Sequence, residues 1–137
     1  MTKPISAHTV LIYLMVTMSA VDRSMSDNEL RKIGTIVQSL PVFDDFDPER
    51  LVTVAEECGA ILSEENGLDV IFSLVKETLP AHLYETAYAL AVEVAAADVT
   101  VQQEEIRLLQ LLRDTLDIEA LTAAAIERGA RARHVRM

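Results

Sequence analysis

Four carboxylates recur at matching positions in two short motifs that lie 76 residues apart. The first motif contains Asp22 and Glu29, and the second contains Asp98 and Glu105. In each motif an apolar run ends at the Asp, a polar turn follows, and the Glu opens an amphipathic segment. If the two motifs pack around a pseudo-twofold axis, the four carboxylates converge. Converging carboxylates repel one another unless protons or a cation neutralise them.

These carboxylates predict a site for a divalent cation. Oxygen ligands suit Ca²⁺, Mg²⁺ or Mn²⁺, which makes Asp22, Glu29, Asp98 and Glu105 candidate metal ligands. A basic protein partner could bind the same acidic turns. The spacing is not that of an EF-hand, because the bend has no Gly and the twelfth position no Glu. An alternative function is a metal-dependent hydrolase that uses the same carboxylates to hold Mg²⁺ or Mn²⁺ and activate water. No general base or substrate-binding group accompanies them, so we expect a non-catalytic protein.

Each carboxylate also has a purely structural interpretation. Asp22 and Asp98 stand at the C-terminal ends of predicted helices, where the helix dipole disfavours a carboxylate by about 0.3–1 kcal/mol. Either Asp can offset this by accepting backbone N–H bonds from its turn. Ser26-x-x-Glu29 has the pattern of a capping box. Both interpretations stay open at this point.

Other reactive side chains give weaker signals. Cys58 is the only cysteine and has a helical context, which favours a packing role over a reactive thiol. The three histidines, His8, His82 and His134, are too scattered for a zinc pattern. Glu93 precedes Asp98 by about one helical turn and is either a buried acid that supports the acidic patch or a residue that faces water.

Charge is unevenly distributed along the chain. The net charge is −10, but residues 1–127 hold 22 acids and 8 bases, a balance of −14. The last ten residues hold four Arg and no acid. The acidic body excludes nucleic-acid binding as a function, because it repels phosphate backbones. We expect one domain over residues 1–129 and a basic, frayed tail over residues 130–137, with an anion- or lipid-binding arm as the alternative interpretation of the tail.

Composition predicts an all-α fold. Half of the residues are apolar, Ala is abundant, and Gly and Pro are only four each. Apolar spacing predicts seven helices in a compact bundle, with the first helix–turn–helix unit duplicated as the fifth and sixth helices. These helices cover residues 5–21, 26–40, 48–62, 68–79, 81–97, 103–115 and 118–129. An apolar helix face can serve either a core or a homodimer.

The first helix is predicted to be central because it is apolar on most faces. No charged residue occurs from Pro4 to Val21. This stretch has a second interpretation as a signal peptide or a short transmembrane helix. Polar residues dilute it, and it pairs with residues 81–97 in the repeat, so a buried core helix in a cytoplasmic protein is favoured.

The two motifs, Ala-Val-Asp-x-x-Met-Ser-x-x-Glu-Leu and Ala-Ala-Asp-x-x-Val-Gln-x-x-Glu-Ile, resemble those of the TerB-like family of tellurite-resistance proteins. Members carry an alanine-rich helix that ends in Ala-Asp-Gly, then a hydrophobic residue, then Ser/Thr-x-x-Glu. The resemblance covers nearly the whole chain, because the family is an all-helical, internally duplicated domain. The chain departs from the pattern at Arg23 and Val99, where the family often has Gly, and at Gln102, where Ser or Thr is usual.

The resemblance implies a cytoplasmic bacterial protein linked to tellurite resistance and wider stress responses. It implies a non-catalytic module with protein partners, including membrane-associated complexes. The acidic positions of the family correspond to Asp22, Glu29, Asp98 and Glu105. The charge balance of the body argues against direct sequestration of tellurite, which is itself an oxyanion.

Overall fold

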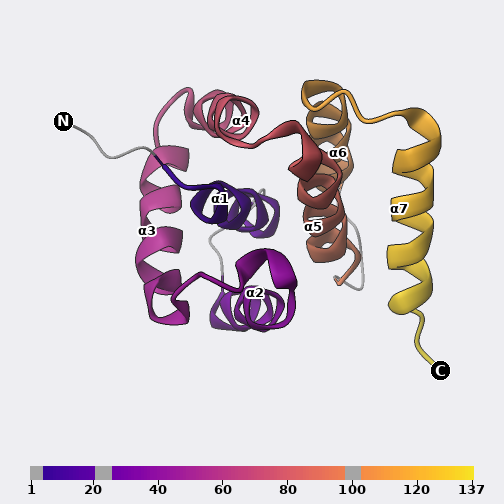
Figure 1. Ribbon diagram of the computed structural model, residues 1–137, viewed down its shortest axis with the longest axis horizontal. Coiled ribbons are helices and arrows are strands. Elements are labelled where there is room, and N and C mark those ends of the chain that lie inside the picture. Colours follow the sequence, from indigo (N-terminus) through magenta and orange to yellow (C-terminus); the bar gives the residue numbers. More distant parts are fainter. Residues whose placement is uncertain (1–4, 21–25, 98–102) are drawn as a thin grey trace.

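The computed structural model describes residues 5–20, 26–97 and 103–137, and these residues form helices without strands (Figure 1). The predicted all-α class and the seven α-helices are confirmed in this part of the chain. The helices are α1 (Ala7–Ser19), α2 (Asp27–Ser39), α3 (Leu51–Leu62), α4 (Gly67–Thr78), α5 (Tyr84–Ala96), α6 (Gln103–Thr115) and α7 (Ala120–Arg133). Three short 3-10 helices lie in the connections between the α-helices: η1 (Pro41–Phe43) follows α2, η2 (Pro48–Arg50) leads into α3, and η3 (Ala81–Leu83) leads into α5.

Helix α1 forms the centre of the fold, as its apolar sequence predicts. Every residue from Thr9 to Ser19 is buried, and α1 packs against α2, α3, α4 and α5. The side chain of Ser6 caps its N-terminus by accepting a hydrogen bond from the Thr9 N–H at 3.2 Å. Among the described residues, no helix combines the length and the apolarity that crossing a bilayer requires.

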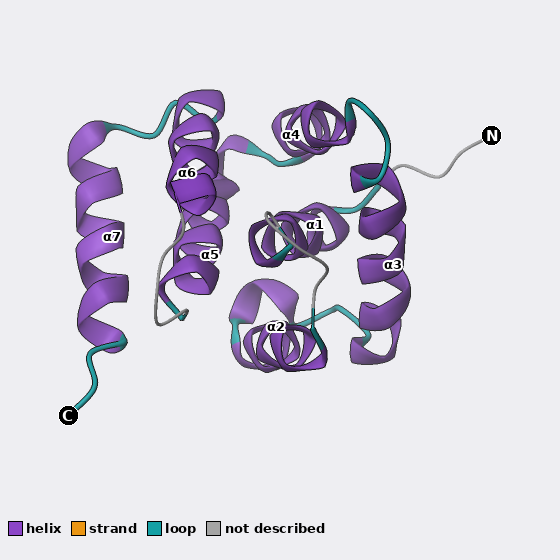
Figure 2. Ribbon diagram, turned by 180° about the vertical axis from the view of Figure 1, so that it is seen from behind, coloured by secondary structure: helices purple, strands orange, loops and turns teal. Residues whose placement is uncertain are grey.

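Helix α5 is the second central element and joins two parts of the molecule. It packs against α1 on one side and against α6 and α7 on the other (Figures 1 and 2). The buried Ala87, Ala91 and Ala95 give it small side chains, which let neighbouring helices approach closely. Helices α6 and α7 both rest on α5 but make little contact with each other. This arrangement leaves space between them.

The loop after α2 buries its two phenylalanines and leaves its aspartates at the surface. Phe43 and Phe46 are buried, with 2% and 7% of their surface exposed, while Asp44 and Asp45 face solvent. Asp47 caps η2 by accepting a hydrogen bond from the Glu49 N–H at 3.0 Å. The start of the helix predicted over residues 48–62 is confirmed, although its first turn is 3-10 rather than α.

The end of α7 corrects a prediction. The sequence suggested a helix end near Gly129 and a frayed tail from residue 130, but α7 continues to Arg133. Ala130 is buried, with 1% of its surface exposed. Arg133 and His134 bind Glu93 on α5. These contacts hold residues 130–134 against the bundle, so a frayed tail over them was wrong.

Candidate functional site

The four predicted metal ligands divide into two groups. Asp22 and Asp98 lie outside the described residues, so their convergence stays a prediction. Glu29 is described and forms the capping box that the sequence suggested. The Ser26 N–H donates to Glu29 Oε1 at 3.0 Å, and the Glu29 N–H donates to Ser26 Oγ at 3.2 Å. Glu29 therefore has a structural role, which leaves part of its acceptor capacity unused.

Glu105 occupies the matching position in α6 but a different environment. Only 2% of its surface is exposed, whereas Glu29 is half-buried. Glu105 lies in the first turn of α6, where the positive end of the helix dipole favours a carboxylate. An ion bound by Glu105 would have to lie beneath the protein surface.

The described ends of the two predicted repeat units lie together. A cavity of about 30 Å³ is lined by Ser19 at the end of α1, by Glu29 and Lys32 in α2, and by Glu93 and Ala97 at the end of α5. The chain segments that contain Asp22 and Asp98 therefore start from one end of the bundle. Within the ranges that the structure describes, no three His, Cys, Asp or Glu side chains form a metal-binding group. A metal centre here thus depends on the two aspartates.

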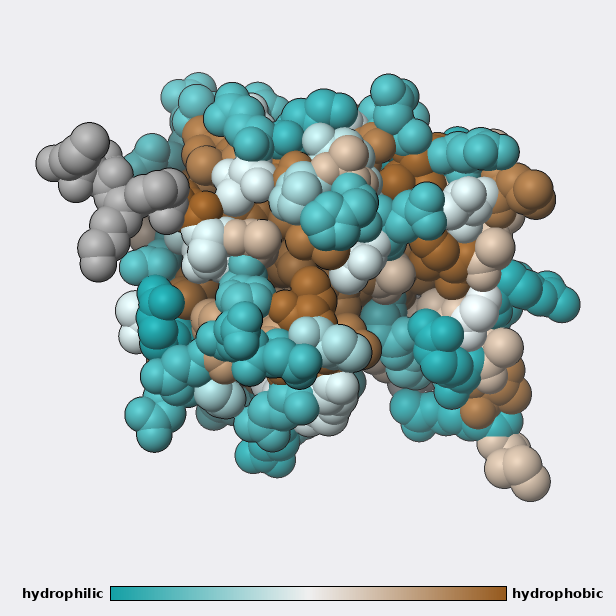
Figure 3. Space-filling model, in the orientation of Figure 1, coloured by the Kyte–Doolittle hydropathy of each residue, from teal (hydrophilic) through white to brown (hydrophobic). Residues whose placement is uncertain are grey.

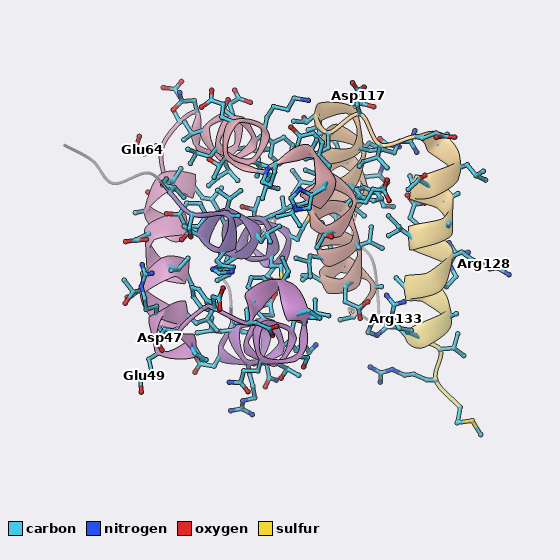
Figure 4. All side chains as sticks on the ribbon, in the orientation of Figure 1. Asp47, Glu49, Glu64, Asp117, Arg128 and Arg133 are labelled. Atoms are coloured by element: carbon cyan, nitrogen blue, oxygen red, sulfur yellow. The ribbon has the colours of Figure 1, made fainter. Side chains whose placement is uncertain are left out.

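Glu93 is bound by two side chains from the C-terminal end of α7. Its Oε1 accepts a hydrogen bond from the Arg133 guanidinium at 2.5 Å, and its Oε2 contacts His134 Nε2. Figure 4 shows Arg133 reaching from α7 towards the end of α5, while Arg128 points away from the bundle. Burial acts to raise the pKa of Glu93, but the hydrogen bonds and charges of Arg133 and His134 outweigh it and lower the pKa. Glu93 is therefore an ionised partner of α7, a role that the sequence did not suggest.

A second contact between α5 and α7 lies closer to the N-terminal ends of these helices than the Glu93 contacts do. Tyr88 has 1% of its surface exposed, and its hydroxyl donates to Glu127 Oε2 at 2.5 Å. Burial, and then the hydrogen bond and charge of Glu127, raise the pKa of this phenol well above its ordinary value. With the Glu93 contacts, this bond fixes α7 parallel to α5 at two levels.

Next to these two contacts between α5 and α7 lies a larger cavity that the sequence did not predict. It has a volume of about 610 Å³ and is bounded by α5, α6 and the C-terminal half of α7. We call it the basic groove; its lining includes Val92, Ala96, Leu109, Arg113, Arg131 and Arg136. The four arginines of the last ten residues were a visible signal, but only the fold brings Arg131 and Arg136 beside Arg113.

Cys58 is a packing residue, as predicted. Its surface is fully buried, and its thiol donates to the Tyr13 carbonyl oxygen at 3.4 Å. Burial raises the pKa of the thiol to about 11, against a smaller opposing effect of the Thr17 hydroxyl. The thiolate that nucleophilic or metal-binding chemistry requires is therefore disfavoured. His8 likewise has a structural role, with Nε2 lying 2.9 Å from the Val42 carbonyl oxygen.

Comparison with known families supports the resemblance seen in the motifs. The family model described as tellurite resistance protein TerB matches residues 8–128, which is most of the chain. Searches of curated proteins and of solved structures gave no match. The matched range runs from the start of α1 into α7 and includes both acidic motifs. The chain therefore belongs to the TerB family of tellurite resistance proteins.

Proposed function

We propose that this protein is a non-catalytic, cytoplasmic binding module whose two acidic turns bind a divalent cation or a basic protein surface. One observation carries the proposal: Ser19, Glu29 and Ala97 line the same small cavity. Asp22 follows Ser19 by three residues, and Asp98 follows Ala97 directly. The two acidic turns thus begin at neighbouring points, which favours a shared site over two separate helix caps.

The described carboxylates fit a cation to different degrees. Glu29 fits because its capping-box bond uses one oxygen, and a carboxylate can accept several bonds. Glu105 fits only an ion held below the surface, since it is 2% exposed. Lys32 lines the same cavity and supplies one positive charge near Glu29. A weakly bound ion, or the lysine-rich surface of a partner, is consistent with this mixture.

Family membership bears on the class of partner. The protein belongs to a tellurite-resistance family, so we propose a role in tellurite or stress resistance through protein partners, membrane-associated complexes among them. The buried thiol of Cys58 and the burial of α1 leave these residues unavailable for chemistry on a substrate. The burial of Cys58 and of α1 supports the non-catalytic part of the proposal.

Thermal melting with Ca²⁺, Mg²⁺ and Mn²⁺ tests the cation. A ligand that binds only the folded state adds about 2.7 kcal/mol of stability at a hundredfold excess over its Kd. We expect one of these ions to raise Tm, and an Asp22→Asn, Asp98→Asn double variant to lose the response. A matched Glu64→Gln, Glu65→Gln variant removes two exposed carboxylates in the turn between α3 and α4 and should keep it (Figure 4).

If no ion acts, a lysine-rich peptide tests the basic partner. The proposal requires that the peptide bind the native protein and the Glu64/Glu65 control but not the Asp22/Asp98 variant. Equal loss in both variants would indicate non-specific attraction, and failure with ions and peptide together would refute the proposed function. Hydrolysis of p-nitrophenyl phosphate that requires Mg²⁺ or Mn²⁺, and that the aspartate variant abolishes, would instead favour the hydrolase.

A further inference from the structure

The basic groove has a hydrophobic floor. Val92, Ala95 and Ala96 of α5 line its base, and Leu109 of α6 lines one wall. Two further hydrophobic side chains in its lining are solvent-exposed, Ile106 by 43% and Val135 by 74%. Figure 3 shows hydrophobic side chains at the surface between α5 and α7, with hydrophilic ones around them. Apolar surface of this kind, rimmed by polar groups, is typical of binding sites.

Positive charge is concentrated in the same groove. Arg113, Arg131 and Arg136 all line it, in a chain whose net charge is −10. Glu127 is the one carboxylate among the described lining residues, and it accepts the hydrogen bond from Tyr88. Arg133 and His134, in contrast, are paired with Glu93. The groove therefore carries positive charge, whereas the rest of the protein is negatively charged. Because charges beyond a Debye length of about 8 Å are largely screened, the nearby arginines determine the electrostatic potential in the groove.

The cations are spread along the groove and not gathered at one point. Arg113 lies in the last turn of α6 and Arg131 in the last turn of α7, and Figure 1 shows that these two helices end at opposite ends of the bundle. The lining of α5 extends from Tyr88 to Ala97, which corresponds to about 14 Å of helix. A ligand with one anionic head would use one end of this row, whereas several carboxylates in a line would use all of it.

We propose that the basic groove binds an acidic amphipathic helix of a partner protein. The alanines of α5 let a fourth helix approach closely, and α6 and α7 form its two walls. The apolar face of the incoming helix contacts Val92, Ala96 and Leu109, and its flanking carboxylates pair with Arg113 and Arg131. This is the helix-in-groove mode of recognition, with charge setting the preference for acidic partners. The inference does not depend on the acidic turns, although Ala97 lines both the basic groove and the small cavity beside Glu29.

A designed peptide provides the test. The probe is a fluorescein-labelled peptide of about 16 residues, with Leu on one helical face and Glu on both flanks. We expect saturable binding to the full-length protein by fluorescence anisotropy. Arg131→Glu should weaken this binding by about tenfold or more, since it replaces attraction with repulsion in the groove. Arg128→Glu is the matched control, because Arg128 is on the same helix but points away (Figure 4).

A second variant tests the apolar floor without changing charge. Ala96→Met fills part of the groove and should also weaken binding, while circular dichroism confirms that the variant folds. Four results would each overturn the inference: no binding of the probe, equal weakening by both arginine variants, preference for a matched peptide with Lys in place of Glu, or no effect of Ala96→Met. Saturable binding of oleate that displaces the probe, or a dimer that Arg131→Glu dissociates, would assign the groove to a lipid or to a second copy instead.

Discussion

Replacing Glu93 with Gln should weaken the attachment of α7, by an amount that depends on pH. Glu93 carries the contacts of Arg133 and His134, which hold the C-terminal end of α7 on α5. Glutamine has almost the same shape but no charge, so the substitution removes the charge-assisted part of both contacts. We expect the free energy of unfolding to fall by about 1 kcal/mol at pH 7.

The magnitude follows from the exposure of the three side chains. Hydrogen bonds to charged groups contribute about 1.5–3 kcal/mol each when they are well shielded. Here Arg133 is 59% exposed, His134 32% and Glu93 26%, so solvent screens the interaction. Exposed ion pairs contribute about 0.2–1 kcal/mol. Two partly screened contacts on one carboxylate together give about 1 kcal/mol.

The direction of the pH dependence follows from the pKa of Glu93. The folded protein lowers this pKa below its ordinary value of 4.5, because Arg133 and His134 outweigh the effect of burial. A carboxylate with a lowered pKa stabilises the folded state fully at pH values above the unfolded pKa, and this contribution is lost as pH falls through the folded pKa. The difference in stability between the native protein and Glu93→Gln should therefore shrink progressively below pH 4.5.

Urea unfolding at pH 7 and at a series of acidic pH values measures this difference. Glu56→Gln is the matched control, since Glu56 is an exposed residue of α3 and its substitution changes the net charge equally. In a double-mutant cycle, Arg133→Ala should cost little more once Glu93 is already Gln. Equal effects of Glu93→Gln and Glu56→Gln at pH 7, or a difference that persists unchanged in acid, would refute the reasoning.

Four further substitutions or treatments have defined outcomes. Tyr88→Phe removes the hydroxyl that binds Glu127 and should cost about 1–2 kcal/mol in urea unfolding; no loss would mean that this short bond contributes nothing. Cys58 should resist iodoacetamide in the native protein at pH 8 and react fully in guanidinium, because burial raises the pKa of its thiol to about 11; rapid native labelling would contradict this. Gly67→Ala should cost about 1–3 kcal/mol, since a Cβ there would lie 2.2 Å from a backbone oxygen at the end of α3. Gly59→Ala, where a Cβ meets nothing within 4 Å, should instead stabilise the helix by about 0.5–1 kcal/mol.

The features that the sequence predicted well are local or compositional. The capping box of Ser26 and Glu29 is a pattern of residues three apart. The central place of α1 follows from its lack of charge, which leaves it no face for water. Such signals need no knowledge of the tertiary structure.

The features that the sequence did not predict depend on residues far apart in the chain. Glu93 binds Arg133 and His134, which are 40 and 41 positions away, and Tyr88 binds Glu127, 39 positions away. No periodicity within a helix reports such pairs. The true end of α7 and the basic groove follow from them.

The two acidic motifs show that residues at matching positions in similar motifs can have different environments. Glu29 and Glu105 match in sequence, yet one is half-buried at a helix cap and the other is 2% exposed. The local sequence determines where a residue stands in the motif. The burial of its side chain depends on the helices that surround it, and these differ between the two motifs. The convergence of Asp22 and Asp98 stays a prediction because both lie outside the described residues, although the neighbouring ends of α1 and α5 favour it.

The burial of α1 has a consequence for synthesis of the chain. Helix α1 leaves the ribosome before the other described helices, but its full burial requires α5, which follows it in the sequence by about 70 residues. Until then the leucines, valines and methionines of α1 are only partly buried. A nascent chain that stalls before α5 therefore exposes hydrophobic surface that promotes aggregation. Chaperone dependence and aggregation of nascent chains should therefore fall once residue 96, the end of α5, has left the ribosome.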